Sequence, residues 1–236
     1  MDHDPYDRRR YPIVGVREGY GEWVATYERT VPDEMDLRLL ERLQSVDWER
    51  PTEILDLACG TGRIGGWLRE RTEAPIDGVD LTGGMLDVAR GKGVYRALEL
   101  ADVTATGLPA ESYDLCVQSL ADEHLPELQP LYTEVVRVTR PGGLFVLAGI
   151  HPHLLMAGMP THFDRAPGDS VTIRSYVHLL SDHVKAAHAL GLSLMEMEEG
   201  LVDEALLDAR PSWTEYAGVP ASFALVWRLP SPRAGE

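Results

Sequence analysis

Cysteine and lysine are almost absent from this sequence of 236 residues. Its two cysteines, Cys59 and Cys116, are too few for a disulfide framework or a four-cysteine zinc site, and we expect both to be small, half-buried residues. Lys92 and Lys185 are the two lysines, so arginine supplies nearly all the positive charge. Neither lysine has a tyrosine four positions before it, which argues against the Tyr-x-x-x-Lys pair of a nicotinamide oxidoreductase.

Positive charge as a whole is also scarce, with 22 basic against 38 acidic residues and a formal net charge of −16. A strongly acidic surface repels phosphate backbones and anionic lipids, so we expect neither a nucleic acid nor a membrane as partner. The longest strongly apolar stretch, residues 144–150, is far too short to span a bilayer, and the segment MDHDPYDRRR has no apolar signal region. These features predict a cytoplasmic protein.

The middle of the chain alternates between short apolar stretches and amphipathic ones. The expected core strands are residues 53–57, 76–79, 95–100, 113–118 and 144–149. The expected core helices are residues 64–71, 84–90 and 128–139, the last of which is stopped by RPGG. This alternation is typical of a doubly wound, Rossmann-like α/β fold with a mostly parallel sheet.

The chain on either side of this core has a different pattern. The expected elements are helices at 19–30 and 33–46, an irregular lid at 151–170, a helix at 171–190, a strand at 192–197 and an antiparallel last strand at 222–228. The two late strands would bring the sheet to seven. We therefore expect a single domain made of an N-terminal helical cap (1–50), a cofactor-binding core (51–150) and a lid with the C-terminal strands (151–236).

A glycine-rich loop follows the first expected core strand. Its sequence GTGRIG, residues 60–65, matches G-x-G-x-x-G, and Asp80 follows Gly60 by twenty positions, which together form a dinucleotide-binding fingerprint. Asp56, however, lies four residues before the first glycine. A pyrophosphate needs backbone amides and a helix N-terminus and gains nothing from a nearby carboxylate. A cofactor with an ammonium group would instead be attracted by the Asp56 carboxylate.

Polar residues also follow the other expected core strands. In an open α/β sheet the ligand binds beyond the carboxyl ends of the strands, where the strand order reverses. Asp80, Asp102 and Gln118 lie at such ends. Each alone is explained by a tight turn or a helix cap, but their joint placement favours a ligand site. Asp80 can bind ribose hydroxyls and Asp102 an adenine amino group, with Leu81 and Met85 on the faces of the ring.

Five consecutive motifs make the chain similar to the class I S-adenosylmethionine-dependent methyltransferases. ILDLACGTGR resembles the first motif of that family and GVDLTGGMLDVAR the second, while ALELADV, YDLCVQSLADEHL and RPGGLFVLAG resemble the next three. The resemblance extends over residues 19–149. It implies S-adenosylmethionine as the cofactor and a small-molecule acceptor.

The resemblance also implies which residues contact the cofactor. The methionine part would be surrounded by Asp56, Ala58, Gly60 and Gly62, the ribose would be held by Asp80, and the adenine would be held by Leu81, Met85, Asp102 and Val103. Gln118 at the end of its strand completes the expected core site. In the N-terminal cap, the segment YGEWVATY is similar to the helix that covers the cofactor in small-molecule members of the family. Tyr20 is the expected cofactor contact. Trp23 and Tyr27 can equally be residues that pack against the domain. Gly65 would then be only a small residue in the first helical turn.

Two positions depart from the family pattern. Gly83-Gly84 replaces the Pro-Glu or similar pair common at that helix start, which can loosen the loop. Glu123 stands where many members have a histidine and leaves His124 as the histidine of that motif.

His124 is the first candidate for the group that removes a proton from the acceptor or orients it. It follows the fourth core strand, and a histidine suits proton transfer near neutral pH. The alternative is a histidine that only packs against or caps the next helix. Among the later histidines, His153 and His178 are expected to contact the substrate, whereas His183 and His188 are expected to be solvated. The lid sequence His-Pro-His with a carboxylate is a possible metal ligand set, but an irregular loop fixes no ligand geometry, so we expect no metal.

The sequence therefore favours an enzyme that transfers a methyl group from S-adenosylmethionine to O, N or C of a small metabolite, in keeping with a natural-product pathway. Its acidic character suits an uncharged or cationic acceptor. Two alternatives remain: a protein that binds S-adenosylmethionine without methylating, as a different catalyst or a partner subunit, and, with less support, an NAD-dependent oxidoreductase. The oligomeric state is expected to be a monomer or a homodimer.

Overall fold

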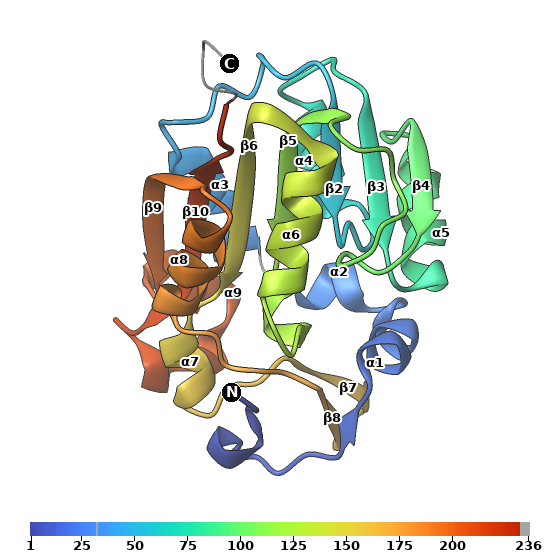
Figure 1. Cartoon of the computed structure of the whole chain (residues 1–236). Helices are drawn as coiled ribbons and strands as arrows, with labels where there is room; N and C mark the ends of the chain where they lie inside the picture. The colour runs from blue at the N-terminus through green and yellow to red at the C-terminus, as the bar shows by residue number, and fades with distance from the viewer. Residues whose placement is uncertain (32, 232–236) are drawn as a thin grey trace.

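The computed structural model describes residues 1–31 and 33–231, and its centre is a seven-stranded sheet (Figure 1). In spatial order its strands are β4 (Ala97–Leu100), β3 (Ile76–Asp80), β2 (Ile54–Leu57), β5 (Tyr113–Ser119), β6 (Thr139–Ile150), β10 (Pro220–Arg228) and β9 (Ser193–Leu201). The first five run parallel, and β10 is antiparallel to both β6 and β9. This confirms the mostly parallel, doubly wound sheet with an antiparallel last strand.

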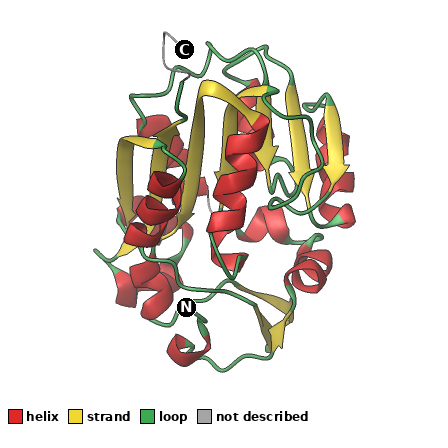
Figure 2. Ribbon diagram, in the orientation of Figure 1, coloured by secondary structure: helices red, strands yellow, loops and turns green. Residues whose placement is uncertain are grey.

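Helices cover both faces of this sheet (Figure 2). One face carries α6 (Gln129–Val138) and α8 (Leu180–Ala189), and the other carries α3 (Leu37–Arg42) and α4 (Arg63–Arg69). Successive strand residues supply the two cores, because side chains alternate across a sheet. Phe145 of β6 packs with α6 and α8, whereas the next residue, Val146, packs with α3 and α4. Within the described ranges no helix is both long and apolar enough to cross a bilayer.

The expectation for residues 151–190 is wrong. In place of an irregular lid and one long helix, the chain forms α7 (Pro152–Met156), the antiparallel pair β7 (His162–Ala166) and β8 (Asp169–Ile173), and only then α8. The signal that was missed is Pro167-Gly168, a turn pair whose glycine has φ +82°. β8 also pairs with β1 (Ile13–Val14), so the N-terminal segment completes a second, three-stranded sheet.

The N-terminal helices are shorter than expected. The first is divided into α1 (Val16–Trp23) and α2 (Tyr27–Thr30), and the second into a 3₁₀ turn η2 (Asp33–Met35) and α3. Helix α3 begins at Asp36, whose carboxylate accepts from the Leu37 N–H. It ends early because Glu196 of β9 accepts the backbone N–H groups of Gln44 and Ser45, which would otherwise continue the helix. Two late elements, α9 (Glu204–Ala209) and η4 (Pro211–Tyr216), join β9 to β10.

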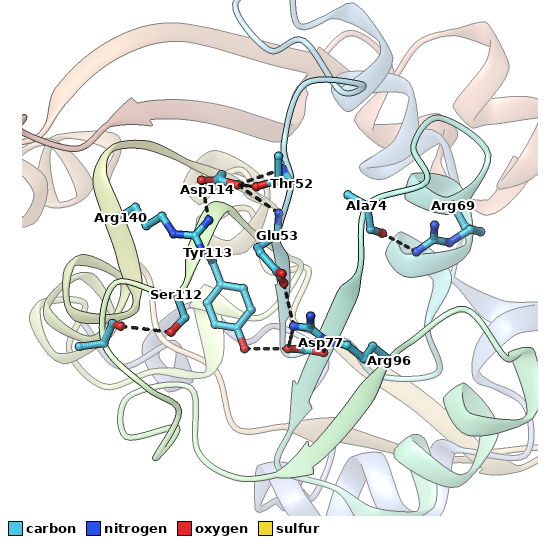
Figure 3. A network of polar contacts seen from close by, with 11 residues as sticks. Thr52, Glu53, Arg69, Ala74, Asp77, Arg96, Ser112, Tyr113, Asp114 and Arg140 are labelled. Carbon is cyan, nitrogen blue, oxygen red and sulfur yellow. Dashed lines mark hydrogen bonds and ion pairs between the residues drawn. The ribbon is translucent and has the colours of Figure 1, made fainter.

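A polar network ties the strands together at their amino ends, away from the ligand edge expected from the sequence (Figure 3). Asp77 of β3 is buried and accepts two bonds from the Arg96 guanidinium, at 2.9 and 2.6 Å. It also accepts a 2.9 Å hydrogen bond from the buried Tyr113 hydroxyl at the start of β5. One carboxylate therefore links β3 to β5 across the intervening β2.

Replacing Asp77 with alanine should lower the free energy of unfolding by about 1–3 kcal/mol, because the buried Tyr113 hydroxyl loses its acceptor and Arg96 keeps only Glu53 of its two carboxylate partners. Chemical denaturation measures the change. Asp87→Ala is the matched control, since its pair with Arg90 is exposed on α5 (Gly83–Lys92) and should contribute less than about 1 kcal/mol. Equal losses in the two variants would contradict the role assigned to the network.

Candidate functional site

Two adjoining cavities lie beside the carboxyl ends of β2, β3 and β5. The smaller one, which we call the loop cavity, lies over the glycine loop and is lined by Gly60 and Asp80. The other, which we call the large cavity, has a volume of about 630 Å³ and is lined by residues of the N-terminal segment, β7 and the chain after α9. Tyr20, Tyr27 and Leu120 line both cavities and form the wall where they meet.

Most of the residues expected around the cofactor line the loop cavity. These are Tyr20, Ala58, Gly60, Asp80, Leu81, Met85, Asp102 and Val103, and His124 lies beside them. Three expected contacts, Asp56, Gly62 and Gln118, do not line it. Asp56 and Gln118 are hydrogen-bonded to neighbouring residues, as described below, and Gly62 lies against the Tyr95 ring.

Asp80 fastens the glycine loop to the end of β3. One of its carboxylate oxygens accepts from the Gly60 N–H at 2.8 Å, and the other accepts from the Thr82 N–H at 2.8 Å. The side chain is largely buried, and this burial raises the pKa of Asp80. The carboxylate thus fixes the loop while remaining part of the cavity wall.

Asp56 lies beneath the glycine loop and is bound by a tyrosine that the sequence did not single out. The Tyr95 hydroxyl donates to Asp56 Oδ2 at 2.6 Å, and the second oxygen, Oδ1, is buried without a hydrogen-bond partner in the described structure. The Tyr95 ring fits because Gly65 has no side chain: a Cβ there would lie 2.2 Å from the hydroxyl oxygen. The third glycine of GTGRIG is therefore required by packing and is more than an incidental small residue.

Two residues other than glycine adopt left-handed backbone conformations at this edge of the sheet. Ala58, after β2, has φ +56°, and Leu120, after β5, has φ +51°. Such conformations are costly for residues with a Cβ and are found preferentially at functional sites. Both residues line the loop cavity, which agrees with a ligand site here. The motif resemblance names Ala58, whereas Leu120 is found only from the structure.

Gln118 shapes the turn that carries the candidate base. Its amide oxygen accepts from the backbone N–H groups of Ala121 at 2.9 Å and Asp122 at 3.1 Å. These bonds hold the start of η3 (Asp122–His124), the 3₁₀ turn that follows β5. Gln118 therefore positions the turn from behind the cavity wall.

His124 forms a polar cluster with Tyr20 and Glu123. Its Nδ1 lies 2.8 Å from the Arg174 carbonyl oxygen, which can only accept, so Nδ1 carries the proton and Nε2 of the neutral ring accepts from the Tyr20 hydroxyl at 2.8 Å. Glu123 Oε1 lies 3.6 Å from the same Nε2. His124 lines the loop cavity, Glu123 lines the large cavity, and Tyr20 lines both.

Glu123, which departs from the family pattern, lies in the wall of the large cavity. Its side chain is buried, and burial raises the pKa of Glu123. One oxygen accepts from the Thr161 hydroxyl at 3.0 Å, while the other has no partner in the described structure. A carboxyl group with an unused oxygen thus lies in the wall of the large cavity. Burial likewise raises the pKa of Tyr20 well above its usual range.

The later histidines lie elsewhere than expected. His153 is exposed on α7, and buried His178 donates to the Leu125 carbonyl at 2.7 Å, so neither lines these two cavities. The expectation that His183 is solvated is wrong: its ring is fully buried, with Nε2 3.4 Å from Asp122 Oδ2. The histidine that does line the large cavity is His162. Across the described residues, no group of three or more His, Cys, Asp or Glu side chains is arranged to hold a metal ion.

The buried Asp56 gives the ligand-free protein a pH-dependent stability. Burial raises the pKa of Asp56 to about 7 from 3.8 in the unfolded chain. Between these values the folded state binds more protons than the unfolded state, so the free energy of unfolding falls as pH rises from about 4 to about 7 and then levels off. Asp56→Asn removes this loss, so the variant should gain stability relative to the wild type as pH rises, by at most about 1.4 kcal/mol per pH unit.

Urea denaturation of both proteins from about pH 5.5 to about pH 8 measures this difference. Asp87→Asn, on an exposed side chain, is the control and should run parallel to the wild type. A constant difference between Asp56→Asn and the wild type across this range would refute the raised pKa.

Known proteins match both the sequence and the fold. Residues 55–147 match the family model of the methyltransferase domain, Methyltransf_11. The malonyl-[acyl-carrier protein] O-methyltransferase of Halorhodospira halophila is 32% identical over 211 residues, 87% of this chain and 65% of that protein. The enzyme of the same name from Serratia marcescens is 37% identical over 109 residues, 46% of this chain and 42% of that protein. The chain therefore spans less than two thirds of the length of these relatives.

A solved structure extends the match to the fold. The S-adenosylmethionine-dependent methyltransferase from Mesorhizobium loti superimposes with a TM-score of 0.67 over 83% of this chain and 97% of that one, at 24% identity. The methyltransferase domain of the sequence match comprises the strands and loops that build the loop cavity. The sequence match and the fold together identify a methyltransferase domain over residues 55–147 of this chain.

Proposed function

We propose that the protein, as a single domain, binds S-adenosylmethionine in the loop cavity and transfers its methyl group to O, N or C of a small metabolite in the large cavity. A natural-product pathway is the setting that the motif resemblance fits. The observation that carries the proposal is the pair of adjoining cavities, one over the glycine loop and one of a size suited to a metabolite, which meet at Tyr20, Tyr27 and Leu120.

The residues of the loop cavity suit the parts of this cofactor. Asp80 offers carboxylate oxygens to a ribose diol, and Leu81, Met85 and Val103 offer apolar surface to an adenine. The space in front of Gly60 is open, since a Cβ there would meet nothing within 4 Å, so a ligand can approach the loop backbone. A pyrophosphate has less to gain here, because two carboxylates, Asp80 and Asp102, line the cavity.

The chain's own residues provide alignment and a route for a proton. Bound S-adenosylmethionine supplies a methyl group that is already activated on a sulfonium, so the protein must mainly hold the acceptor in line with it. Tyr20 lies at the junction of the cavities and donates to His124 Nε2, so its oxygen can receive a proton from the acceptor while its own proton passes to His124. The carboxyl group of Glu123, when ionised, would favour the imidazolium that forms 3.6 Å away.

Isothermal titration with S-adenosylmethionine, S-adenosylhomocysteine and NAD tests the cofactor. The wild type should bind the first two, and Asp80→Ala should weaken binding at least about tenfold, because the ribose loses charged acceptors and the Gly60 loop loses its anchor. Asp87→Ala, an exposed aspartate on α5, should leave the affinity unchanged. Binding of NAD alone would overturn the proposal in favour of an oxidoreductase.

The catalytic cluster is tested by release of S-adenosylhomocysteine in a screen of small hydroxylated, aminated and carboxylated aromatic compounds. With the best acceptor, His124→Asn and Tyr20→Phe should each lower kcat by about 10²–10⁴-fold if proton transfer is required, with cofactor affinity little changed. His188→Asn, an exposed histidine on α8, is the control. Full activity in both variants would show that the cluster stabilises the fold and takes no part in proton transfer. Tight cofactor binding with no turnover of any compound would support the alternative of a non-methylating protein.

A further inference from the structure

Two arginines line the large cavity away from the wall it shares with the loop cavity. Arg9 comes from the N-terminal segment and Arg210 from the end of α9, and both are half-buried. Neither forms an ion pair with a carboxylate within 4.0 Å among the residues that the structure describes. The two guanidinium groups thus come from segments 200 residues apart and meet one cavity.

His162 also lines the large cavity and is bonded to one of these arginines. Its Nδ1 is 2.8 Å from the Pro160 carbonyl, so Nδ1 is the protonated nitrogen and Nε2 accepts from Arg9 at 2.5 Å. Burial is the main cause that lowers the pKa of His162. The charges of Arg9 and Arg210 also lower it, whereas the Pro160 carbonyl and the Asp164 carboxylate oppose this shift. Arg9 is hydrogen-bonded to this imidazole, and Arg210 lines the same cavity, so both guanidinium groups belong to its wall.

Of the two guanidinium groups, that of Arg210 makes fewer hydrogen bonds to the described residues. Arg9 uses one nitrogen for His162 and another for the Met159 sulfur, at 2.9 Å. The Arg210 guanidinium makes no hydrogen bond to any residue of the described ranges. Burial lowers the pKa of Arg210, and Glu34, which is not in contact with it, opposes this effect. The donors of this half-exposed guanidinium are therefore occupied by no group of the described residues and are free to bind a ligand that enters the cavity.

The position of these arginines is unusual in a chain with such an excess of acidic residues. With 38 acidic against 22 basic residues, a carboxylate is easily available as a partner, and several exposed arginines have one, such as Arg38 with Asp203. Two carboxylates, Asp164 and Glu123, do line the large cavity, but among the described residues neither lies within 4.0 Å of Arg9 or Arg210. The two arginines are therefore available to bind an anionic group of a ligand.

The rest of the cavity wall is largely apolar and aromatic. Tyr11, Trp23, Phe163 and Trp213 line it, with Leu154 beside them. A ligand with an apolar body and one anionic end matches this combination, since a carboxylate takes two parallel hydrogen bonds from a guanidinium.

We propose that Arg9 and Arg210 form a carboxylate-binding subsite, so that the acceptor is an apolar or aromatic carboxylic acid held by its anionic end while the other end reaches the wall of Tyr20, Tyr27 and Leu120. This proposal rests on the proposed function in taking the large cavity as the acceptor site. It replaces the expectation of an uncharged or cationic acceptor, which followed from the net charge of the whole chain.

Calorimetric binding of two probes of the same shape tests the subsite. In the presence of saturating S-adenosylhomocysteine, 2-naphthoate should bind the wild type at least about tenfold more tightly than neutral 2-naphthamide. Arg210→Gln should remove most of this preference by weakening the naphthoate alone, and Arg9→Gln should act in the same direction. The control is Arg29→Gln, an exposed arginine on α2 that lines neither cavity and changes the net charge equally.

The outcomes separate the two proposals. Equal affinities for the two probes, no binding of naphthoate to the wild type, or an unchanged preference in Arg210→Gln would each overturn the subsite. Binding of S-adenosylhomocysteine is measured first in every variant, and it should match the wild type because the loop cavity is untouched. Loss of that binding in the wild type would overturn the proposed function, whatever the result with the naphthoate pair.

Discussion

The site depends on one buried hydrogen bond, from the Tyr95 hydroxyl to Asp56 beneath the glycine loop. The bond forms because the ring can pass close to three glycines: a Cβ at Gly62 or Gly78 would lie 3.0 Å from the ring, and one at Gly65 would lie 2.2 Å from its oxygen. Asp56 is thereby held at the end of β2, and the chain turns directly into left-handed Ala58 and the loop. Asp80 then anchors the same loop from the next strand. The floor of the loop cavity is rigid because each of its parts is fastened to a strand end.

The wall between the two cavities is assembled from segments far apart in the chain. Tyr20 comes from α1 and bonds to His124 after β5, whose other ring nitrogen bonds to the Arg174 carbonyl after β8. The small sheet brings these segments together, because β1 and β8 pair in parallel and the Arg174 N–H donates to the Val14 carbonyl. A proton route through Tyr20 therefore depends on the second sheet as much as on the first.

The net charge of the chain is negative, whereas two of the charged side chains that line the large cavity are positive. The net charge of −16 governs encounters with nucleic acids and membranes over long distances. Inside the large cavity the relevant charges are those within a few ångströms, and there two guanidinium groups without carboxylate partners face an aromatic wall. The specificity of a site follows the local groups, since screening removes the influence of distant surface charges.

The sequence by itself determined the seven-stranded sheet and most of the residues that line the loop cavity. These follow from local order: buried strands alternate with helices, and residues such as Asp80, Met85 and Asp102 lie at or within a few residues of the carboxyl ends of strands, which meet at one edge of a parallel sheet. The tertiary structure alone decided which histidine faces a cavity, what Gly65 is for, and where residues 151–190 lie. His162, Arg9 and Arg210 come from distant segments and line one cavity, and no periodicity or spacing in the sequence records this, because it depends on how whole elements pack.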